Sequence, residues 1–320
     1  MLILLLITTA LFALPLAPTA GLFLWRRHAL GPPQLSEGAY TPDHFARTLI
    51  GKLRSHLPIL DGARPLIQEH RLDGEPLLVV PSTVHRIGSD CIKTMTYALG
   101  DITLPASLSF KKEVAAEGSL RSGENGRYRV LYSADILHLA KNSTIIRWCH
   151  AGRQLVIDGG AQILGRATAN VRMIVAAPCM FTSLTAPEIV IGDGGEALPA
   201  EAGAGALEVW VEEERVVQGD LALPANSRHR GSLKAHGRLL IGADSIVTGG
   251  LVCDGDISIG PRCRIWGPVV ADGAIEIAGG CVIGRPGRPA SVAGASVSVV
   301  TPGLVYGAVH ASHSGIISNT

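Results

Sequence analysis

Two histidines and one pair of aspartates come nearest, by type and spacing, to acid–base or metal chemistry. A histidine is the usual general base, and His150 and His236 both stand close to expected turns of the chain. Neither has neighbours that specify a base, so both are interpreted as surface histidines without a catalytic role. Asp254-Gly255-Asp256 could supply two metal ligands, but Asp and Gly are also turn residues, and the turn interpretation is favoured.

Six cysteines could do thiol chemistry: Cys91, Cys149, Cys179, Cys253, Cys263 and Cys281. An even number permits disulfides in an oxidising compartment. However, Cys263 and Cys281 are 18 residues apart, so they occupy one position of a repeat, and Cys253 replaces an apolar residue. These positions predict buried, reduced thiols that act as small hydrophobic side chains.

A local run of positive charge is the strongest candidate binding feature. Residues 226–238 contain no acid and carry two histidines and four cations, namely Arg228, Arg230, Lys234 and Arg238. Just upstream, residues 192–214 carry seven acids and no base. The basic run is therefore expected to pair with the acidic segment, or to meet anionic lipid or an acidic partner. No G-x-S-x-G, H-E-x-x-H, C-x-x-C or P-loop pattern is present, so we expect no catalytic residue, metal or cofactor.

An 18-residue repeat organises these residues. Gly219, Gly237, Gly255 and Gly273 each open a short motif of the form G-x-[IL]-x-[IL]. Alternation of apolar and other residues is the period of a strand. Short strands joined by Gly-rich corners, repeating every 18 residues, predict an all-β solenoid. Ile257 and Ile259 should point inward and Ser258 outward.

The same period divides the chain into two blocks. Leu137, Leu155, Met173 and Ile191 are also 18 residues apart. We expect solenoid block 1 over 100–191, an acidic Ala/Gly-rich insertion over 192–213, block 2 over 214–311, and a tail over 312–320. Across the 320 residues, 47% are apolar but only 4% are aromatic, as suits a narrow core. The net charge of +1 predicts no nucleic-acid partner.

The N-terminal region resembles a membrane anchor. Residues 2–25 hold 24 uncharged positions, more than the roughly 20 that a membrane-crossing helix needs. Arg26 and Arg27 follow directly, and the positive-inside rule then places the body in the cytoplasm. We expect an anchor over 1–27, as opposed to a cleaved signal peptide.

Residues 28–99 should form a linker, an amphipathic helix and an N-terminal cap. Phe45, Leu49, Leu53 and Leu57 recur every four residues after a helix start at Pro42. This helix is expected either to rest on an anionic membrane or to pack against the following domain.

An anchor ahead of G-D-[IL]-x-[IL] coils resembles the bactofilin family of polymer-forming bacterial cytoskeletal proteins. The resemblance covers residues 214–311 well and 100–191 more weakly, and bactofilins usually have a single solenoid. It implies a right-handed β-helix that assembles end to end and organises envelope or polysaccharide-synthesis proteins at the bacterial inner membrane.

A hexapeptide-repeat acyltransferase, with a left-handed β-helix, is the alternative. Ile241, Val247, Cys253, Ile259 and their successors fall six residues apart, as in that fold. The small residue expected four positions on is replaced by Val269 and Ile275 at two places.

The last coil is the predicted self-association surface. A terminal coil leaves backbone groups and core unpaired unless it is capped. Only a short tail follows Val305, Tyr306 and Val309. We therefore expect two or more copies to pair through these three residues.

Overall fold

A computed structural model describes residues 43–56, 68–72, 74–80, 90–192, 211–212 and 215–319. The part from Phe45 to Thr320 is one compact unit, built as a β-solenoid of about 12 turns with about 18 residues each. The predicted anchor over 1–27 lies outside the described residues. Within the described ranges, no helix is long and apolar enough to span a bilayer.

Block 1 follows one helix and a hairpin. The helix is α3 (His44–His56), and the hairpin pairs β1 (Gln68–Leu72) with β2 (Glu75–Val80). The further strands are β3 (Cys91–Ile92), β4 (Met95–Ala98), β5 (Ile102–Thr103), β6 (Ser109–Ala116), β7 (Leu120–Arg121), β8 (Arg127–Ser133), β9 (Ile136–Leu139), β10 (Thr144–Ala151), β11 (Gln154–Ile157), β12 (Ala161–Ala169), β13 (Arg172–Val175) and β14 (Cys179–Ile191).

Block 2 contains shorter strands up to its last coil. They are β15 (Val211–Glu212), β16 (Arg215–Val217), β17 (Leu221–Leu223), β18 (Arg228–Arg230), β19 (Leu233–Ala235), β20 (Leu239–Ile241), β21 (Ile246–Val247), β22 (Leu251–Cys253), β23 (Ile257–Ile259), β24 (Arg264–Ile265), β25 (Val269–Ala271), β26 (Ala274–Ile277), β27 (Cys281–Ile283), β28 (Ala290–Val300) and β29 (Gly303–Ser318).

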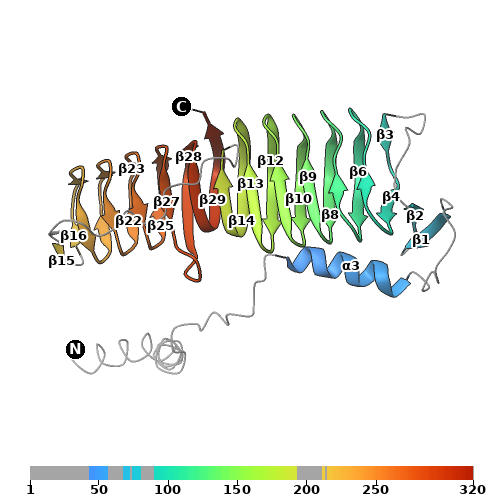
Figure 1. Cartoon of the computed structure of the whole chain (residues 1–320), viewed down its shortest axis with the longest axis horizontal. Coiled ribbons are helices and arrows are strands. Elements are labelled where there is room, and N and C mark those ends of the chain that lie inside the picture. The colour runs from blue at the N-terminus through green and yellow to red at the C-terminus, as the bar shows by residue number, and fades with distance from the viewer. Residues whose placement is uncertain are drawn as a thin grey trace, which may run out of the picture. The chain divides into compact units, whose positions relative to one another are not determined.

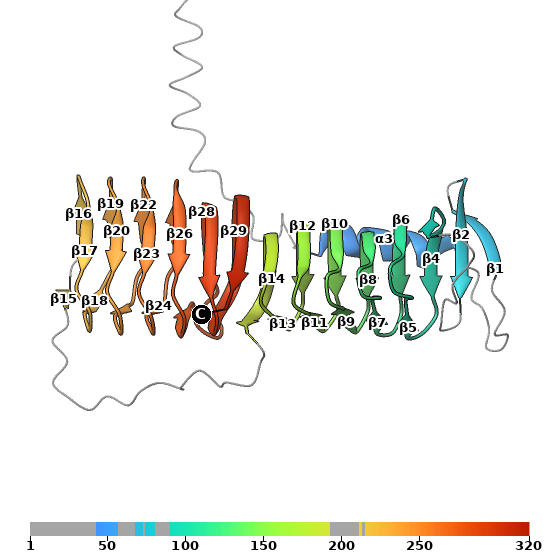
Figure 2. The ribbon, with the colours of Figure 1, turned by 90° about the horizontal axis from the view of Figure 1, so that it is seen from above.

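Each coil contributes to three parallel ladders that run along the solenoid (Figure 2). In block 2 the first ladder is β17–β20–β23–β26, the second β16–β19–β22–β25, and the third β15–β18–β21–β24–β27. Residues paired between successive coils are 18 apart, for example Leu239 with Ile257. The predicted period is therefore confirmed as one turn of the solenoid.

The predicted alternation of side chains is also confirmed. Ile257 and Ile259 are fully buried and Ser258 between them is not. Every six residues of block 2 contribute two inward side chains, so each coil has three sides of equal length. The core is a continuous column of Leu, Ile, Val, Ala and Cys side chains, narrow enough that large rings are rare.

The two blocks meet at an antiparallel seam between β14 and β29 (Figure 1). Both blocks progress along the solenoid towards this seam. Thus Cys179 lies opposite Ile317, Leu184 opposite Val309, and Ile189 opposite Val305. β14 and β29 are long enough to serve all three ladders, so all three continue from one block to the other. Apart from the β1–β2 hairpin, the other named strand pairs in the described residues are parallel.

The predicted tail over 312–320 is wrong for residues 312–318. These residues belong to β29, where they complete the final coil, and Ile317 is fully buried. The four-residue displacement after Gly284 made that final coil hard to align, because it shifts the repeat out of phase.

The first coils of block 1 begin earlier than the predicted residue 100. Strands β3 and β4 already pair in parallel with β6, and β2 pairs with β4. The glycines that mark the repeat later in the chain are missing from these coils, so the period was hidden in the sequence.

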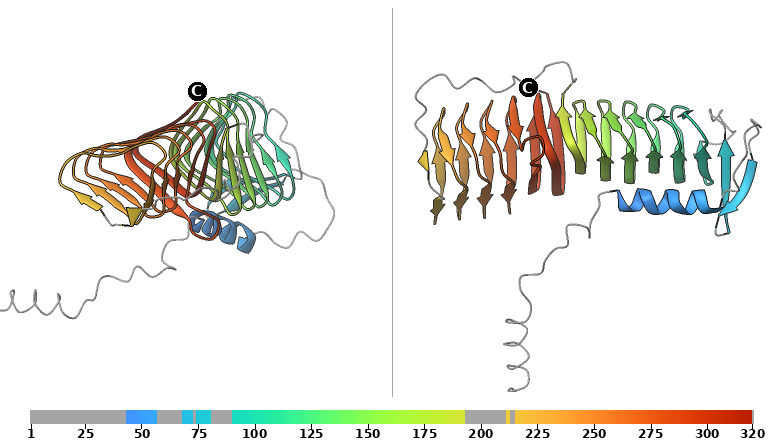
Figure 3. Two further views of the ribbon diagram at one scale, coloured as in Figure 1. Left: turned by 60° about the vertical axis from the view of Figure 1, so that its left-hand side comes forward. Right: turned by 60° about the horizontal axis from the view of Figure 1, so that its bottom comes forward.

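Helix α3 packs against the second ladder of block 1 (Figure 3). Ile50 and Leu53 are buried with Leu77, Val79 and Tyr97 of the sheet. Of the two predicted settings for this helix, packing against the following domain is the one observed. Phe45, expected on the apolar side, is instead half-exposed beside Arg166.

Candidate assembly site

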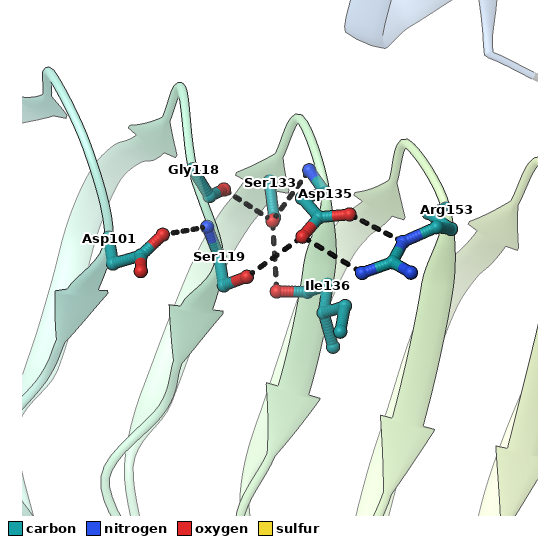
Figure 4. A network of polar contacts seen from close by, with 7 residues as sticks. All are labelled: Asp101, Gly118, Ser119, Ser133, Asp135, Ile136 and Arg153. Atoms are coloured by element: carbon teal, nitrogen blue, oxygen red, sulfur yellow. Dashed lines mark hydrogen bonds and ion pairs between the residues drawn. The ribbon is translucent and has the colours of Figure 1, made fainter.

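Polar side chains at one corner of each coil hold neighbouring coils together (Figure 4). Asp101 Oδ1 accepts a hydrogen bond from the Ser119 N–H at 2.7 Å, and the Ser119 hydroxyl donates to Asp135 at 3.2 Å. Arg153 then donates to both oxygens of Asp135, at 2.6 and 3.1 Å. The Arg153 guanidinium holds the pKa of the Asp135 carboxyl below its usual value. These groups therefore satisfy the backbone and each other.

The G-D motif follows from the same contact. Asp220 and Asp256 each accept the N–H of a residue 18 positions later, at 2.7 and 2.9 Å. A Cβ on the glycine 17 positions after each aspartate would lie 2.2 to 2.3 Å from the carboxylate oxygen. The aspartate thus requires glycine in the next coil. This geometry supports the turn interpretation of Asp256 in Asp254-Gly255-Asp256.

The first coil of block 2 has an open edge. Among the described residues, strands β15, β16 and β17 each pair on one side only, with β18, β19 and β20. Arg215 N–H and Val217 C=O bond to the β19 side. Because peptide groups alternate in direction along a strand, the N–H and C=O of Val216 point away from β19. By the same alternation, those of Ala222 point away from β20.

The first coil of block 1 is partly covered. β1 pairs with β2, and β2 with β4, so the hairpin extends the second ladder beyond β4. Strands β3 and β5 have one partner each among the described residues. The expected N-terminal cap over 60–99 thus corresponds to a hairpin on one side of the coil.

The predicted self-association residues lie within the seam. Val305 and Val309 are buried opposite Ile189 and Leu184, and Tyr306 is partly buried between them. The prediction required a last coil without a neighbour, and block 1 supplies that neighbour within the same chain. Self-association through Val305, Tyr306 and Val309 therefore loses its physical basis. Periodicity gave no sign of this, because it does not encode which coils stack.

The four predicted basic residues do not share one side of the solenoid. Arg228 and Arg230 project from β18, Lys234 from β19, and Arg238 precedes β20, so they lie on three successive sides of one coil. Sequence reasoning missed Arg264, which projects from the same ladder as Arg228 two coils later. Its spacing of 36 residues, twice the period, could have found it.

The two candidate histidines have structural partners. His236 Nδ1 lies 2.6 Å from an oxygen of Asp254, in the coil above. His150 is buried, which corrects its interpretation as a surface residue. Its ring stacks on Tyr132, and its Nδ1 lies 2.8 Å from the Thr168 hydroxyl.

The prediction of buried thiols is confirmed for five of the six cysteines, and Cys91 is partly exposed. Cys263 and Cys281 stack in adjacent coils and donate to the carbonyls of Gly242 and Gly260. A hydrogen bond to Cys263, together with burial, raises the pKa of Cys281. The cysteines therefore serve the core.

Comparison with protein-family models, with curated proteins and with solved structures found no match to this chain. What can be concluded at this level is the architecture: a β-solenoid of two blocks, joined at their last coils, whose first coil of block 2 has an open edge among the described residues.

Proposed function

We propose that the protein is a non-catalytic scaffold that assembles with itself through β15, β16 and β17. In this proposal it is a bactofilin-like, right-handed solenoid, anchored by residues 2–25 in the bacterial inner membrane with its body in the cytoplasm. Its role is to organise envelope or polysaccharide-synthesis proteins.

The open edge of the first coil of block 2 carries the proposal. Three adjacent strands there present peptide groups on the side without a described partner, and such edges pair readily with another chain. The side chains that looked chemical in the sequence are engaged in coil-to-coil contacts, as Asp256 and His236 illustrate.

The seam gives a precedent for the geometry of assembly. At β14 and β29, two coils of this type stack antiparallel along all three ladders. Two copies meeting at β15–β17 would repeat that arrangement around a two-fold axis, which is the commonest symmetry of homo-oligomers. The smallest assembly expected is therefore a dimer, and longer polymers form if β3 and β5 pair as well.

Proline substitutions on the edge test this model. Val216→Pro and Ala222→Pro each remove an N–H that points away from the block, so the fold should be kept and pairing lost. Sedimentation velocity of the full chain in detergent should show dimers or larger species for the wild type and monomers for the double variant.

The matched control is Val216→Ala with Ala222→Ser, which changes the side chains but retains both N–H groups. It should assemble like the wild type, and thermal unfolding should be alike for all three proteins. A wild-type chain that is monomeric at tens of micromolar, or a proline variant that still assembles, would refute the proposal.

A further inference from the structure

The outward side of the third ladder in block 2 carries a column of arginines. Arg228 and Arg230 project from β18, and Arg264 projects from β24, two coils further along. We call these three residues the arginine column. Between and beyond them on the same ladder lie Ile246 and Val282, neither of them fully buried.

The same ladder in block 1 treats its cations differently. There Arg172 Nε lies 3.6 Å from Glu188 in the next coil, and His138 lies 3.0 Å from Asp158. In block 2, the two ladder neighbours of Arg264 are Ile246 and Val282. A nearby corner acid, Asp244, is held by both guanidinium nitrogens of Arg262 at 2.7 Å. The ladder positions on either side of Arg264 are therefore apolar, whereas Arg172 has an acid at its ladder position in the next coil.

A strongly acidic segment begins and ends on this ladder. Residues 193–210 contain four acids (Asp193, Glu196, Glu201 and Glu208) and no Lys, Arg or His. They follow the end of β14, whose Ile191 pairs with Gly303, and precede β15, whose Val211 pairs with His229. Both attachment points thus belong to the third ladder, one at the seam and one at the opposite end of block 2.

The length of the segment fits a path along the column. Its attachment points are six coil steps apart, or about 29 Å at about 4.8 Å per step. Eighteen residues can span up to about 60 Å when fully extended. The shortest path between the two points follows the third ladder and crosses Arg264, Arg228 and Arg230.

We propose that the arginine column is a docking surface for an acidic polypeptide chain, and that its occupant is residues 193–210 of the same molecule. Opposite charges attract over about 10 Å at moderate ionic strength, and the covalent attachment at both ends raises the local concentration of the acids. An acidic partner protein would have to displace this segment to reach the arginines.

Limited proteolysis of the full chain tests the proposal. An elastase cleaves after small residues, and residues 193–210 contain several alanines. The wild type should be cut in this segment slowly at low salt and faster at high salt. Arg228→Gln with Arg264→Gln should be cut about fivefold faster at low salt, the factor that two exposed ion pairs together account for.

Arg172→Gln is the matched control, because it removes a cation from the same ladder that already has its own acid, Glu188. Its cleavage rate in 193–210 should equal that of the wild type. A charge exchange sharpens the test: Arg264→Glu should accelerate cleavage, and adding Glu201→Lys should restore protection. Circular dichroism confirms that each variant is folded.

Equal cleavage of the wild type and the Arg228/Arg264 variant at all salt concentrations would overturn the proposal. Protection that disappears on dilution would also overturn it, because the segment would then reach the column of a second copy. Repeating the assay with Val216→Pro and Ala222→Pro separates this inference from the assembly proposal, since those substitutions leave the arginines in place.

Discussion

Val309 in the last coil of block 2 lies directly opposite Leu184 in the last coil of block 1, and both side chains are fully buried. The contact joins two solenoids that would otherwise each end in an exposed cross-section. It gives the chain an internal tail-to-tail junction, so the available ends are the two first coils. Assembly must therefore use surfaces far from the C-terminus in sequence.

Val309→Asp should strongly destabilise the protein. An unpaired carboxylate would be buried in the seam, at a cost of several kcal/mol. Ile316→Asp on the same strand is the control, because Ile316 is 44% exposed, and its effect should stay within about 0.5 kcal/mol. Urea unfolding measures both. A Val309→Asp variant as stable as the wild type would contradict the seam.

Gly237→Ala should destabilise the fold by about 1–3 kcal/mol, as overpacking typically does. The new Cβ would lie 2.2 Å from Asp220 Oδ1 and 2.7 Å from the Asp220 nitrogen. Gly219 has the same place in the motif, but a Cβ added there would meet nothing within 4 Å among the described residues, so Gly219→Ala should be nearly neutral. Thermal unfolding distinguishes them, and similar losses would show that the Asp–Gly contact is unimportant.

Docking of helix α3 should weaken in acid. Arg54 Nε donates to Glu117 at 2.9 Å and the Tyr97 hydroxyl donates to the same carboxylate, and the Arg54 hydrogen bond lowers the pKa of Glu117. A lowered carboxyl pKa contributes stability above the unfolded value, near 4.5, and this contribution is lost as pH falls through the folded value.

The thermal stability of the wild type relative to Glu117→Gln should therefore be highest near neutral pH and should shrink below pH 4.5. The gain is small, because Arg54 is more than half exposed and solvent screens the pair. Glu124→Gln, at an exposed turn residue, serves as the control. A stability difference for Glu117→Gln that does not change with pH would contradict the proposed coupling.

Native thiols should react slowly, with one exception. Burial raises the pKa of Cys179 to about 12 and also raises that of Cys149, so both stay protonated and inaccessible at neutral pH. Titration with a chromogenic disulfide reagent should label Cys91 first and the remaining thiols only on unfolding. Cys91→Ser should abolish the fast phase, and fast labelling of five or six native thiols would disprove the core assignment.

The sequence by itself determined the repeating unit. Glycines and aspartates at a spacing of 18, with alternating apolar residues such as Ile257 and Ile259, are local signals. They specify the turn, the strand and the side that faces inward, because a neighbouring coil always presents the same environment. The core of block 2 could therefore be predicted residue by residue, and the buried cysteines with it.

Only the tertiary structure decided how the blocks meet. The alternation that buries Val305 and Val309 is the same whether the next coil runs parallel or antiparallel, and peptide groups on a strand edge accept either partner. The helix shows the same limit: Ile50 and Leu53 form an apolar side that suits a membrane or a sheet, and Tyr97 and Val79 become its partners only in the folded chain. Local patterns fix which side of an element is apolar, whereas its partner depends on contacts between residues far apart in sequence.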